Sequence, residues 1–321
     1  MQKLTIDINA ELARLNWQRQ PAGLYEPIAY VLQAGGKRLR PTLVMAACRL
    51  YDGNEQQTLP AALAIEIFHN FTLLHDDVMD QAPVRRGRPT VHIRWDNNTA
   101  ILSGDQMLTE AYMQLEHLDA AIQPRALRLF NKMASDIYAG QQYDMDFEKR
   151  ENVTTDEYIE MIRLKTSVLL GMALQLGGLT AGAPEADLEK LYRIGEHLGL
   201  AFQIQDDVLD VWGDEKTFGK RIGGDIVQNK KSLVQILALQ HADADALMQL
   251  KGWLHRSEFI EEEKIREVTA IYNAIGVRPL CEERISYYMQ LAMSDIDALA
   301  VPEEKKEILR DIARGLLNRQ N

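Results

Sequence analysis

The sequence contains two copies of an acidic pattern, DDxxD, in which three aspartates fall within five residues. The first copy is Asp76, Asp77 and Asp80, and the second is Asp206, Asp207 and Asp210. On a helix the first and last aspartates of a copy share a face, with the second about 100° round, so their oxygens converge on a small volume. Such a cluster repels itself without cations, and Mg²⁺ is a natural partner because it takes oxygen ligands and is commonly shared with substrate phosphates.

A single DDxxD is more often a solvated helix end than a metal site, because short acidic patterns arise by chance. The presence of two copies in one chain favours a metal site instead. Each copy follows apolar sequence instead of Lys or Arg at i±4, which is the wrong arrangement for a salt-bridged surface. A calcium EF-hand is not favoured, since neither copy has the loop spacing, glycine or terminal glutamate of that motif. The pattern predicts metal clusters that bind phosphate.

Small groups of basic residues stand beside glycines in the same parts of the chain. They are Lys37, Arg38 and Arg40 in GGKRLRP, Arg85 and Arg86 in APVRRGRP, Lys220 in FGKRIGGD, and Lys230 and Lys231 in QNKKS. Glycine lets the backbone approach an anion closely, and a helix N-terminus attracts anions. One such group is usually a solvated loop, but here basic groups follow both acidic clusters. This pairing indicates that the acidic residues bind metal ions and that the basic residues bind phosphate oxygens.

Helices must position these residues, because the apolar periodicity throughout is helical. Residues 154–175 repeat apolar side chains at three and four residues, and Thr154 with Glu157 forms a capping box. Residues 61–75 are apolar almost all round, which predicts a central helix. No sustained period-2 alternation occurs, so the predicted fold class is all-α. No linker composition divides the chain, and we assign one domain, 1–321.

Composition excludes several classes of protein. The 46% hydrophobic and 26% charged content rules out intrinsic disorder, and 36 basic against 47 acidic side chains give a net charge of -11, which disfavours nucleic acid and anionic lipid. The uncharged run 167–183 is too short and interrupted to span a bilayer, so we expect a buried helix. Two cysteines, Cys48 and Cys281, and a start without a secretory segment favour the cytoplasm.

The acidic and basic motifs together resemble the signature blocks of the trans-isoprenyl diphosphate synthases, the polyprenyl synthetases that include farnesyl and geranylgeranyl diphosphate synthases. The matching segments are GGKRLRP, EIFHNFTLLHDDVMDQAPVRRGRPTVH, NTAILSGDQML, GQQYDMD, RLKTSVLL, GLAFQIQDDVLDVWGD and FGKRIGGDIVQNKKS. They span residues 35 to about 235 in order. The resemblance implies a large single-domain helical bundle of the isoprenoid synthase type, with a central cavity between the two DDxxD helices, and a homodimer.

The implied activity is the head-to-tail condensation of isopentenyl diphosphate with an allylic diphosphate, namely dimethylallyl, geranyl or farnesyl diphosphate. About three Mg²⁺ ions are expected from the resemblance. The six aspartates would hold them. Arg85, Lys165, Thr166, Gln203, Lys220 and Lys230 would contact the allylic diphosphate, and Lys37, Arg40, His69 and Arg86 would hold isopentenyl diphosphate. His75, beside Asp76, is expected to be structural.

The residue inventory agrees with this chemistry. The allylic C–O bond must ionise, so metals and cations must absorb the charge of the leaving diphosphate, and no side-chain nucleophile is required. Phe71, five residues before Asp76, resembles the aromatic residue that limits product length in short-chain members. Its helical-wheel angle from Asp76 is about 140°, so its orientation into a channel comes from the resemblance alone. Both a C15 and a C20 product stay open.

Other functions fit the sequence less well. A longer-chain polyprenyl synthase would tend to have a small residue at the position of Phe71. An HD-type metal phosphohydrolase, suggested by His69 and His75-Asp76, would leave the second DDxxD and GGKRLRP unused. A catalytically silent partner subunit often lacks one acidic cluster, and a terpene cyclase needs no isopentenyl diphosphate site.

Overall fold

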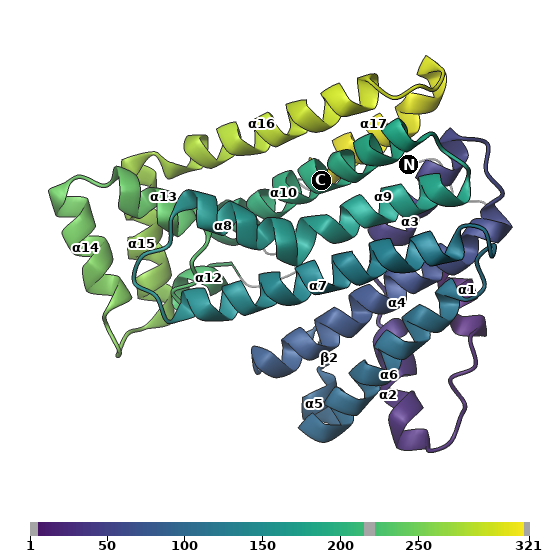
Figure 1. The fold of residues 1–321 in the computed structure, drawn as a ribbon. Helices are drawn as coiled ribbons and strands as arrows, with labels where there is room; N and C mark the ends of the chain where they lie inside the picture. The colour runs from purple at the N-terminus through teal and green to yellow at the C-terminus, as the bar shows by residue number, and fades with distance from the viewer. Residues whose placement is uncertain (1–5, 215–221, 318–321) are drawn as a thin grey trace. The chain divides into compact units, whose positions relative to one another are not determined.

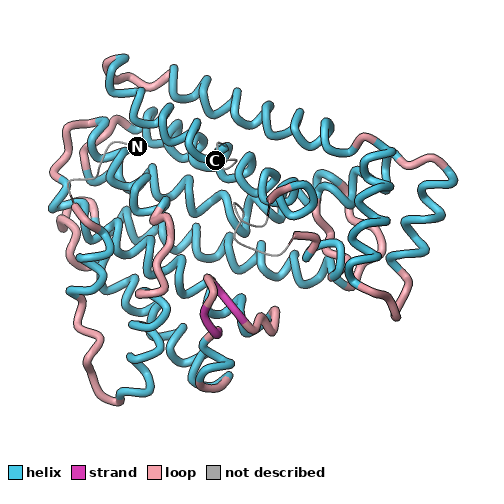
Figure 2. The backbone as a smooth tube through the Cα atoms, turned by 180° about the vertical axis from the view of Figure 1, so that it is seen from behind, coloured by secondary structure: helices cyan, strands magenta, loops and turns pink. Residues whose placement is uncertain are grey.

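The computed structural model describes residues 6–214 and 222–317, and within these ranges the chain is mostly helical, with loops joining the helices (Figures 1 and 2). The strands there are an antiparallel pair of two residues each, β1 (Val84–Arg85) and β2 (Arg88–Pro89), drawn in magenta in Figure 2. The predicted all-α class is therefore confirmed.

The chain forms two compact units. Unit 1 contains the described residues up to Met133 together with Leu169–Tyr192 and Leu299–Ile308. Unit 2 contains Ala134–Val168, Arg193–Ala298 and the described residues from Leu309 onwards. Helices α7 (Gln123–Glu148), α10 (Glu185–Trp212) and α17 (Glu303–Leu317) contribute residues to both.

Unit 1 is built around a long central helix. Besides β1 and β2, its elements are α1 (Ile8–Arg14), α2 (Ala22–Leu32), α3 (Leu39–Leu50), α4 (Glu55–Met79), α5 (Val91–Arg94), α6 (Asn97–Leu115) and most of α9 (Val168–Thr180). Helix α4 begins at the cap Asn54 and packs against α3 and α6. Every residue from Ala61 to Phe68 is buried, as the apolar run 61–75 predicted. Helix α4 ends at Met79, so the central helix leads directly into the first acidic cluster.

Unit 2 surrounds the second acidic cluster with shorter helices. They are α8 (Thr155–Ile162), the π-helical turn η1 (Arg163–Ser167), α12 (Gly224–Val227), α13 (Leu233–His241), α14 (Ala244–Leu254), α15 (Glu261–Ile275) and α16 (Val277–Asp297). The capping box of Thr154 and Glu157 is present at the start of α8. The single helix expected over 154–175 is interrupted, however, because η1 separates α8 from α9.

The run 167–183 proved to be largely the buried helix α9, as predicted. None of the helices among the described residues has the length and apolar character needed to cross a bilayer. Both cysteines are buried free thiols.

Candidate active site

Both acidic clusters lie at the C-terminal ends of helices. Asp76 and Asp77 are in the last turn of α4 and Asp80 is its C-cap, while Asp206, Asp207 and Asp210 lie in the last two turns of α10. A helix C-terminus carries partial negative charge, so carboxylates placed there are electrostatically unfavourable without a cation. The location itself therefore indicates that positive charge is supplied by a ligand or a neighbour.

In the first cluster, the middle aspartate is held by the protein. Asp77 is 6% exposed, and Arg85 Nε donates to its Oδ1 at 2.7 Å. Burial raises the pKa of Asp77, and the Arg85 guanidinium opposes that shift. Asp76 is half-buried and Asp80 is exposed. The strand pair β1–β2 therefore places a cation directly against the first DDxxD.

The turn between β1 and β2 directs the second arginine of RRG toward the glycine loop that precedes α3. Arg86 and Gly87 both have left-handed backbones, with φ of 52° and 72°, which is the pattern of a tight type I′ hairpin turn. Arg86 donates to the carbonyl of Gly35, and a Cβ at Gly36 would lie 3.1 Å from its guanidinium carbon. Gly36 therefore leaves the space that the Arg86 side chain occupies.

A buried ion pair fixes the loop GGKRLRP on α4. Arg38, 8% exposed, donates through Nη1 to Glu66 Oε1 and through Nη2 to the carbonyl of Leu32, each at 2.5 Å. Asn70 Nδ2 also donates to Glu66 Oε1, at 3.0 Å. Charge-assisted bonds between buried partners set their geometry firmly. Glu66 was not predicted from the sequence, although an acidic residue inside an apolar helix was a usable signal.

His69 lies at the centre of the cationic part of unit 1. Arg40 Nη1 lies 3.1 Å from its Nε2 and can only donate, so this nitrogen accepts and the proton is on Nδ1. Burial, then Arg40, Arg86, Arg85 and Arg38 in that order, hold the pKa of His69 well below 6.5. The imidazole is therefore neutral. Four guanidinium groups acting on one histidine mark a place where an anion would be stabilised.

The same region contains a pocket of about 380 Å³. Its lining includes Asp77, Arg85 and Arg86 together with Asn70 and Tyr30. The Asn70 side-chain oxygen is buried and finds no hydrogen-bond donor among the described residues. Lys37 is exposed on the loop before α3. The four predicted isopentenyl diphosphate ligands all belong to unit 1; they are Lys37, Arg40, His69 and Arg86.

In the second cluster, Asp207 is again the residue held by the protein. It is 5% exposed, and its Oδ2 accepts hydrogen bonds from the Tyr158 hydroxyl and from the backbone N–H of Leu233, the latter at 2.9 Å. Burial and Asp225 raise the pKa of Asp207 to about 7. Asp210 Oδ2 accepts from the N–H of Asp225 at 3.0 Å, and Asp206 is half-buried.

The π-helical turn η1 presents Lys165 and Thr166. Lys165 Nζ is 2.5 Å from Asp144 Oδ2 on α7, and Thr166 Oγ1 donates to Gln203 Oε1 on α10 at 3.3 Å. Gln203 Nε2 lies 3.5 Å from Asp207 Oδ1. Lys165, Thr166 and Gln203 therefore lie in one polar network with the second acidic cluster.

Two glycines allow η1 to lie close to its neighbours. A Cβ at Gly140 of α7 would lie 2.3 Å from the backbone nitrogen of Lys165, and one at Gly199 of α10 would lie 2.6 Å from Ser167 Cα. Real Cβ atoms essentially never approach other atoms within 3.0 Å. Neither glycine was singled out from the sequence, where a helical glycine carries no signal of what lies against it.

The remaining predicted residues are placed as follows. Lys230 is exposed in the segment between α12 and α13, and its N–H donates to the carbonyl of Asp225 at 2.9 Å. Lys220 lies outside the described residues. Phe71 is 5% exposed, with its ring centroid 4.8 Å from that of His75. His75 Nε2 lies 3.2 Å from the carbonyl of Ile101 on α6, the contact expected of a structural histidine.

The acidic clusters offer ligand atoms of one chemical kind to a metal ion. Within residues 6–214 and 222–317, no three His, Cys, Asp or Glu side chains form a ready-made metal cage. The acidic clusters nevertheless offer only carboxylate oxygens, without thiol or imidazole ligands, and hard cations such as Mg²⁺ prefer this chemistry. The residues present therefore fit magnesium.

The comparisons with known proteins decide the family. A family model described as polyprenyl synthetase matches residues 21–273. The chain belongs to the polyprenyl synthetase family. It is 37% identical to the geranylgeranyl diphosphate synthase of Methanosarcina mazei over 309 residues, which are 95% of this chain and 89% of that protein.

Solved structures agree with this polyprenyl synthetase assignment. A geranylgeranyl pyrophosphate synthase crystal structure matches with a TM-score of 0.91 and 41% identity, covering 98% of this chain and 96% of that one. Another, from Corynebacterium glutamicum and complexed with isoprenyl diphosphate and magnesium, matches with a TM-score of 0.85 and 27% identity over 97% and 95% of the two chains. The predicted family is confirmed.

The polyprenyl synthetase is accordingly a short-chain trans-prenyltransferase, which makes trans-prenyl diphosphates from isopentenyl diphosphate and an allylic diphosphate. Its family is magnesium-dependent. The HD-type phosphohydrolase hypothesis is thereby excluded.

Proposed function

We propose that the two DDxxD clusters bind about three Mg²⁺ ions for the ionisation of the allylic diphosphate. When bound, these ions would absorb the negative charge that develops on the leaving diphosphate. The single observation that supports this proposal is the placement of both carboxylate clusters at helix C-termini, where neutralisation must come from cations.

The middle aspartate of each cluster is held by the rest of the protein. Asp77 and Asp207 are buried and accept hydrogen bonds from Arg85 and from Tyr158. Asp210 is also buried and accepts from the N–H of Asp225. All six aspartates would supply oxygens for metal, and the hydrogen bonds to Asp77, Asp207 and Asp210 would fix the shape of each cluster.

The cations of the chain complete the proposed chemistry. As the allylic C–O bond breaks, its electron pair passes to the diphosphate oxygen, and Arg85, Lys165 and Lys230 donate hydrogen bonds to that diphosphate. Thr166 and Gln203 assist as neutral partners, and Lys220 has the same proposed role. The isopentenyl double bond attacks the allylic cation, a C–C bond forms, and a proton leaves for the released diphosphate.

Isopentenyl diphosphate would bind to Lys37, Arg40, His69 and Arg86. A neutral His69 fits this role, because it can donate from Nδ1 while its Nε2 accepts from Arg40.

The product would be C15 or C20, with Phe71 limiting the length of the growing chain. We place the enzyme in the cytoplasm on the basis of its two free cysteines.

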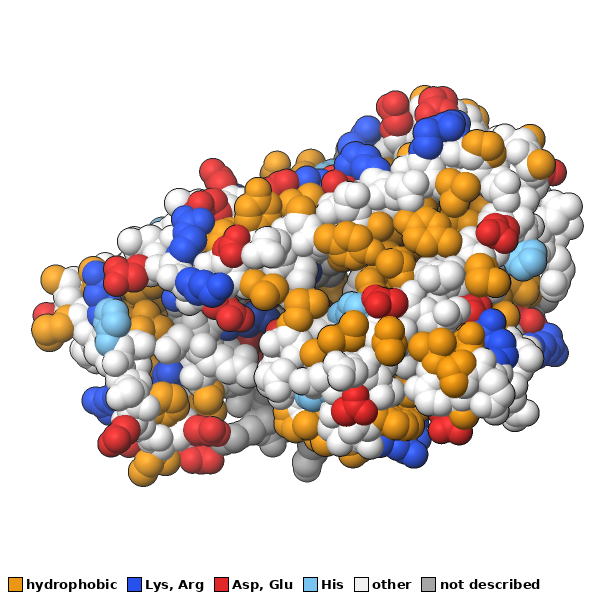
Figure 3. Space-filling view, turned by 60° about the horizontal axis from the view of Figure 1, so that its bottom comes forward, with side chains coloured by type: hydrophobic (Ala, Val, Ile, Leu, Met, Phe, Trp, Pro, Cys, Tyr) orange, Lys and Arg blue, Asp and Glu red, His pale blue; other side chains and the backbone are white. Residues whose placement is uncertain are grey.

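We further propose that residues 1–321 act as one prenyltransferase domain and that the enzyme is a homodimer. The family match supports the first proposal, since residues 21–273 include parts of both units. Exposed apolar side chains on α5 and α6 support the second: Ile93 is 55% exposed and Leu102 is 59% exposed. Figure 3 shows such hydrophobic side chains, in orange, gathered in patches among charged groups on the face that it draws. Light scattering on the purified protein would give the oligomeric state.

The proposed metal roles are tested by aspartate substitution. With Mg²⁺, isopentenyl diphosphate and an allylic primer, the purified enzyme should release diphosphate and form a longer prenyl chain. Asp76→Ala and Asp206→Ala should lower turnover by roughly 100-fold or more, as loss of a preorganised electrostatic group does, while thermal stability stays nearly intact. Asp245→Ala, at an exposed position on α14, is the matched control. Wild-type turnover in either cluster variant would remove the metal-site proposal.

A further inference from the structure

The stretch from Gly223 to Leu233, which contains α12 and the segment between α12 and α13, is fastened at both ends to the second acidic cluster. At its start, the N–H of Gly223 donates to the carbonyl of Asp210 at 2.6 Å. At its end, the N–H of Leu233 donates to Asp207 Oδ2 at 2.9 Å. Residues 228–232, which we call the Lys230 loop, lie between these attachments. Their conformation therefore sets where Lys230 stands relative to the aspartates.

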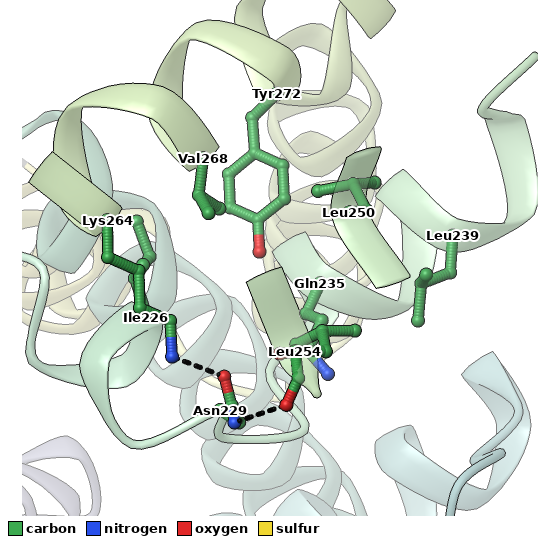
Figure 4. A pocket seen from close by; sticks show the side chains of 9 residues that line it. All are labelled: Ile226, Asn229, Gln235, Leu239, Leu250, Leu254, Lys264, Val268 and Tyr272. Carbon is green, nitrogen blue, oxygen red and sulfur yellow. Dashed lines mark hydrogen bonds between the residues drawn. The ribbon is translucent and has the colours of Figure 1, made fainter. Parts of the chain in front are cut away.

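A buried lysine from α15 contacts the start of this loop. Lys264 is 1% exposed, and its Nζ donates to Asn229 Oδ1 at 2.6 Å (Figure 4). The same Nζ donates to the carbonyl of Val227 at 3.2 Å. The ammonium also lies 4.2 Å from the ring centroid of Phe259. Lys264 thus binds one main-chain carbonyl, that of Val227, and one side chain, that of Asn229, just before Lys230.

The surroundings of Lys264 are unusual for a buried cation. Among the described residues, no carboxylate lies within ion-pair distance of its Nζ. Burial lowers the pKa of Lys264, and an ammonium removed from water without an acidic partner is expensive unless its hydrogen bonds are strong. An apolar residue would suit this position in the core better. Core packing alone therefore does not explain why the lysine is there.

Asn229 transmits the contact to the loop. Its backbone is left-handed, with φ of 54°, a conformation that asparagine tolerates better than most residues. Its side chain accepts from Lys264 and donates from Nδ2 to the carbonyl of Leu254 at 3.1 Å. Because Lys230 is the next residue, the orientation of Asn229 determines the direction in which the chain enters Lys230.

A small polar pocket lies beside the start of the loop. Asn229, Gln235 and Tyr272 line it, and the Tyr272 hydroxyl points inward (Figure 4). Gln235 Nε2 is buried there without a hydrogen-bond partner among the described residues. The Lys264 and Asn229 bonds therefore restrain the start of the loop from the α15 side, and the backbone hydrogen bond from Lys230 N–H to the carbonyl of Asp225 at 2.9 Å restrains it from within.

We propose that Lys264 is a positioning residue for the condensation reaction: acting through Val227 and Asn229, it holds Lys230 where Lys230 binds the allylic diphosphate. The inference rests on the proposed role of Lys230. Lys264 itself does not touch the substrate.

The test uses steady-state kinetics of the full-length enzyme. Lys264→Met keeps an unbranched side chain one atom shorter and removes the charge and both hydrogen bonds. We expect the KM for the allylic diphosphate to rise about tenfold, because a rise of that size corresponds to the loss of roughly one good hydrogen bond to a charged group. The KM for isopentenyl diphosphate should stay within about twofold of the wild-type value. The double variant with Lys230→Ala should be no worse than Lys230→Ala alone, since the two residues act in series.

Two further variants separate positioning from stability. Asn229→Gly preserves the left-handed backbone and removes the side-chain link, so it should reproduce the effect of Lys264→Met even if the latter folds poorly. Lys306→Met removes a lysine that is 7% exposed and paired with Glu303 at 3.2 Å, and it should change stability without changing either KM.

The outcomes distinguish this inference from the proposed function. If Lys230→Ala raises the allylic KM but Lys264→Met and Asn229→Gly only lower the melting temperature, Lys264 is structural and the inference alone is overturned. If Lys230→Ala leaves the allylic KM unchanged, the proposed role of Lys230 is wrong and the inference fails with it.

Discussion

Substitution of Gly140 by alanine would test whether the geometry of η1 limits the reaction rate. The new methyl carbon would lie 2.3 Å from Lys165 N, 2.7 Å from Lys165 Cα and 2.8 Å from the carbonyl carbon of Leu164. Ordinary contacts begin at 3.4 Å, so the closest backbone atom is about 1 Å too near. Since backbone cannot rotate away as a flexible side chain can, η1 must shift by about that distance.

The expected effect follows from the displacement. A misplacement of about 1 Å in a catalytic group can cost roughly 100-fold in rate, and overpacking of this kind costs about 1–3 kcal/mol of unfolding free energy. We therefore expect turnover of Gly140→Ala to fall by roughly 100-fold, while the protein still folds with a melting temperature lowered by several degrees. Initial rates of diphosphate release, measured at saturating substrates beside thermal unfolding, would give both quantities.

A matched glycine provides the control. Gly178 on α9 is also packed, but a Cβ there would meet only side chains, at 2.5 Å from Leu191 and 3.1 Å from Leu188. Gly178→Ala should lose comparable stability and retain its turnover. A Gly140→Ala enzyme that is destabilised yet turns over at the wild-type rate would refute the argument, because η1 would then tolerate displacement without consequence for Lys165.

Three other predictions concern unit 1. Glu66→Gln leaves the buried Arg38 guanidinium without a counter-charge and should lower the free energy of unfolding by roughly 3–5 kcal/mol in urea titrations; an unchanged midpoint would contradict it. His69 is neutral when folded but takes up a proton near pH 6.5 when unfolded, so acidification from pH 7 to 5 favours the unfolded state, and the wild type should lose roughly 2 kcal/mol more than His69→Gln. Equal losses in the two proteins would show that the folded imidazole is not neutral. Phe71→Ala should lengthen the prenyl product in chromatographic sizing, because the proposed limit on the growing chain is the Phe71 ring; the same distribution as the wild type would exclude Phe71 as the limit.

The sequence by itself determined the fold class and the chemical class of the protein. Both depend on local spacing: the helical period of three to four residues in 61–75 and the repeated DDxxD are visible without knowledge of distant neighbours. The order of the signature blocks added the family. The capping box at Thr154 was also predictable, since both of its partners lie within one turn.

Only the tertiary structure decided what each aspartate contacts. Asp207 is enclosed by Tyr158, 49 residues away, and by the N–H of Leu233, 26 residues away, so the two adjacent carboxylates of DD have different environments although the sequence presents them as equals. The π-helical turn likewise breaks a periodicity that predicted one continuous helix, because glycines from other helices let their backbones pack against it. Hydrogen bonds and close contacts between distant segments leave no periodic trace in the sequence, and these contacts orient the candidate site.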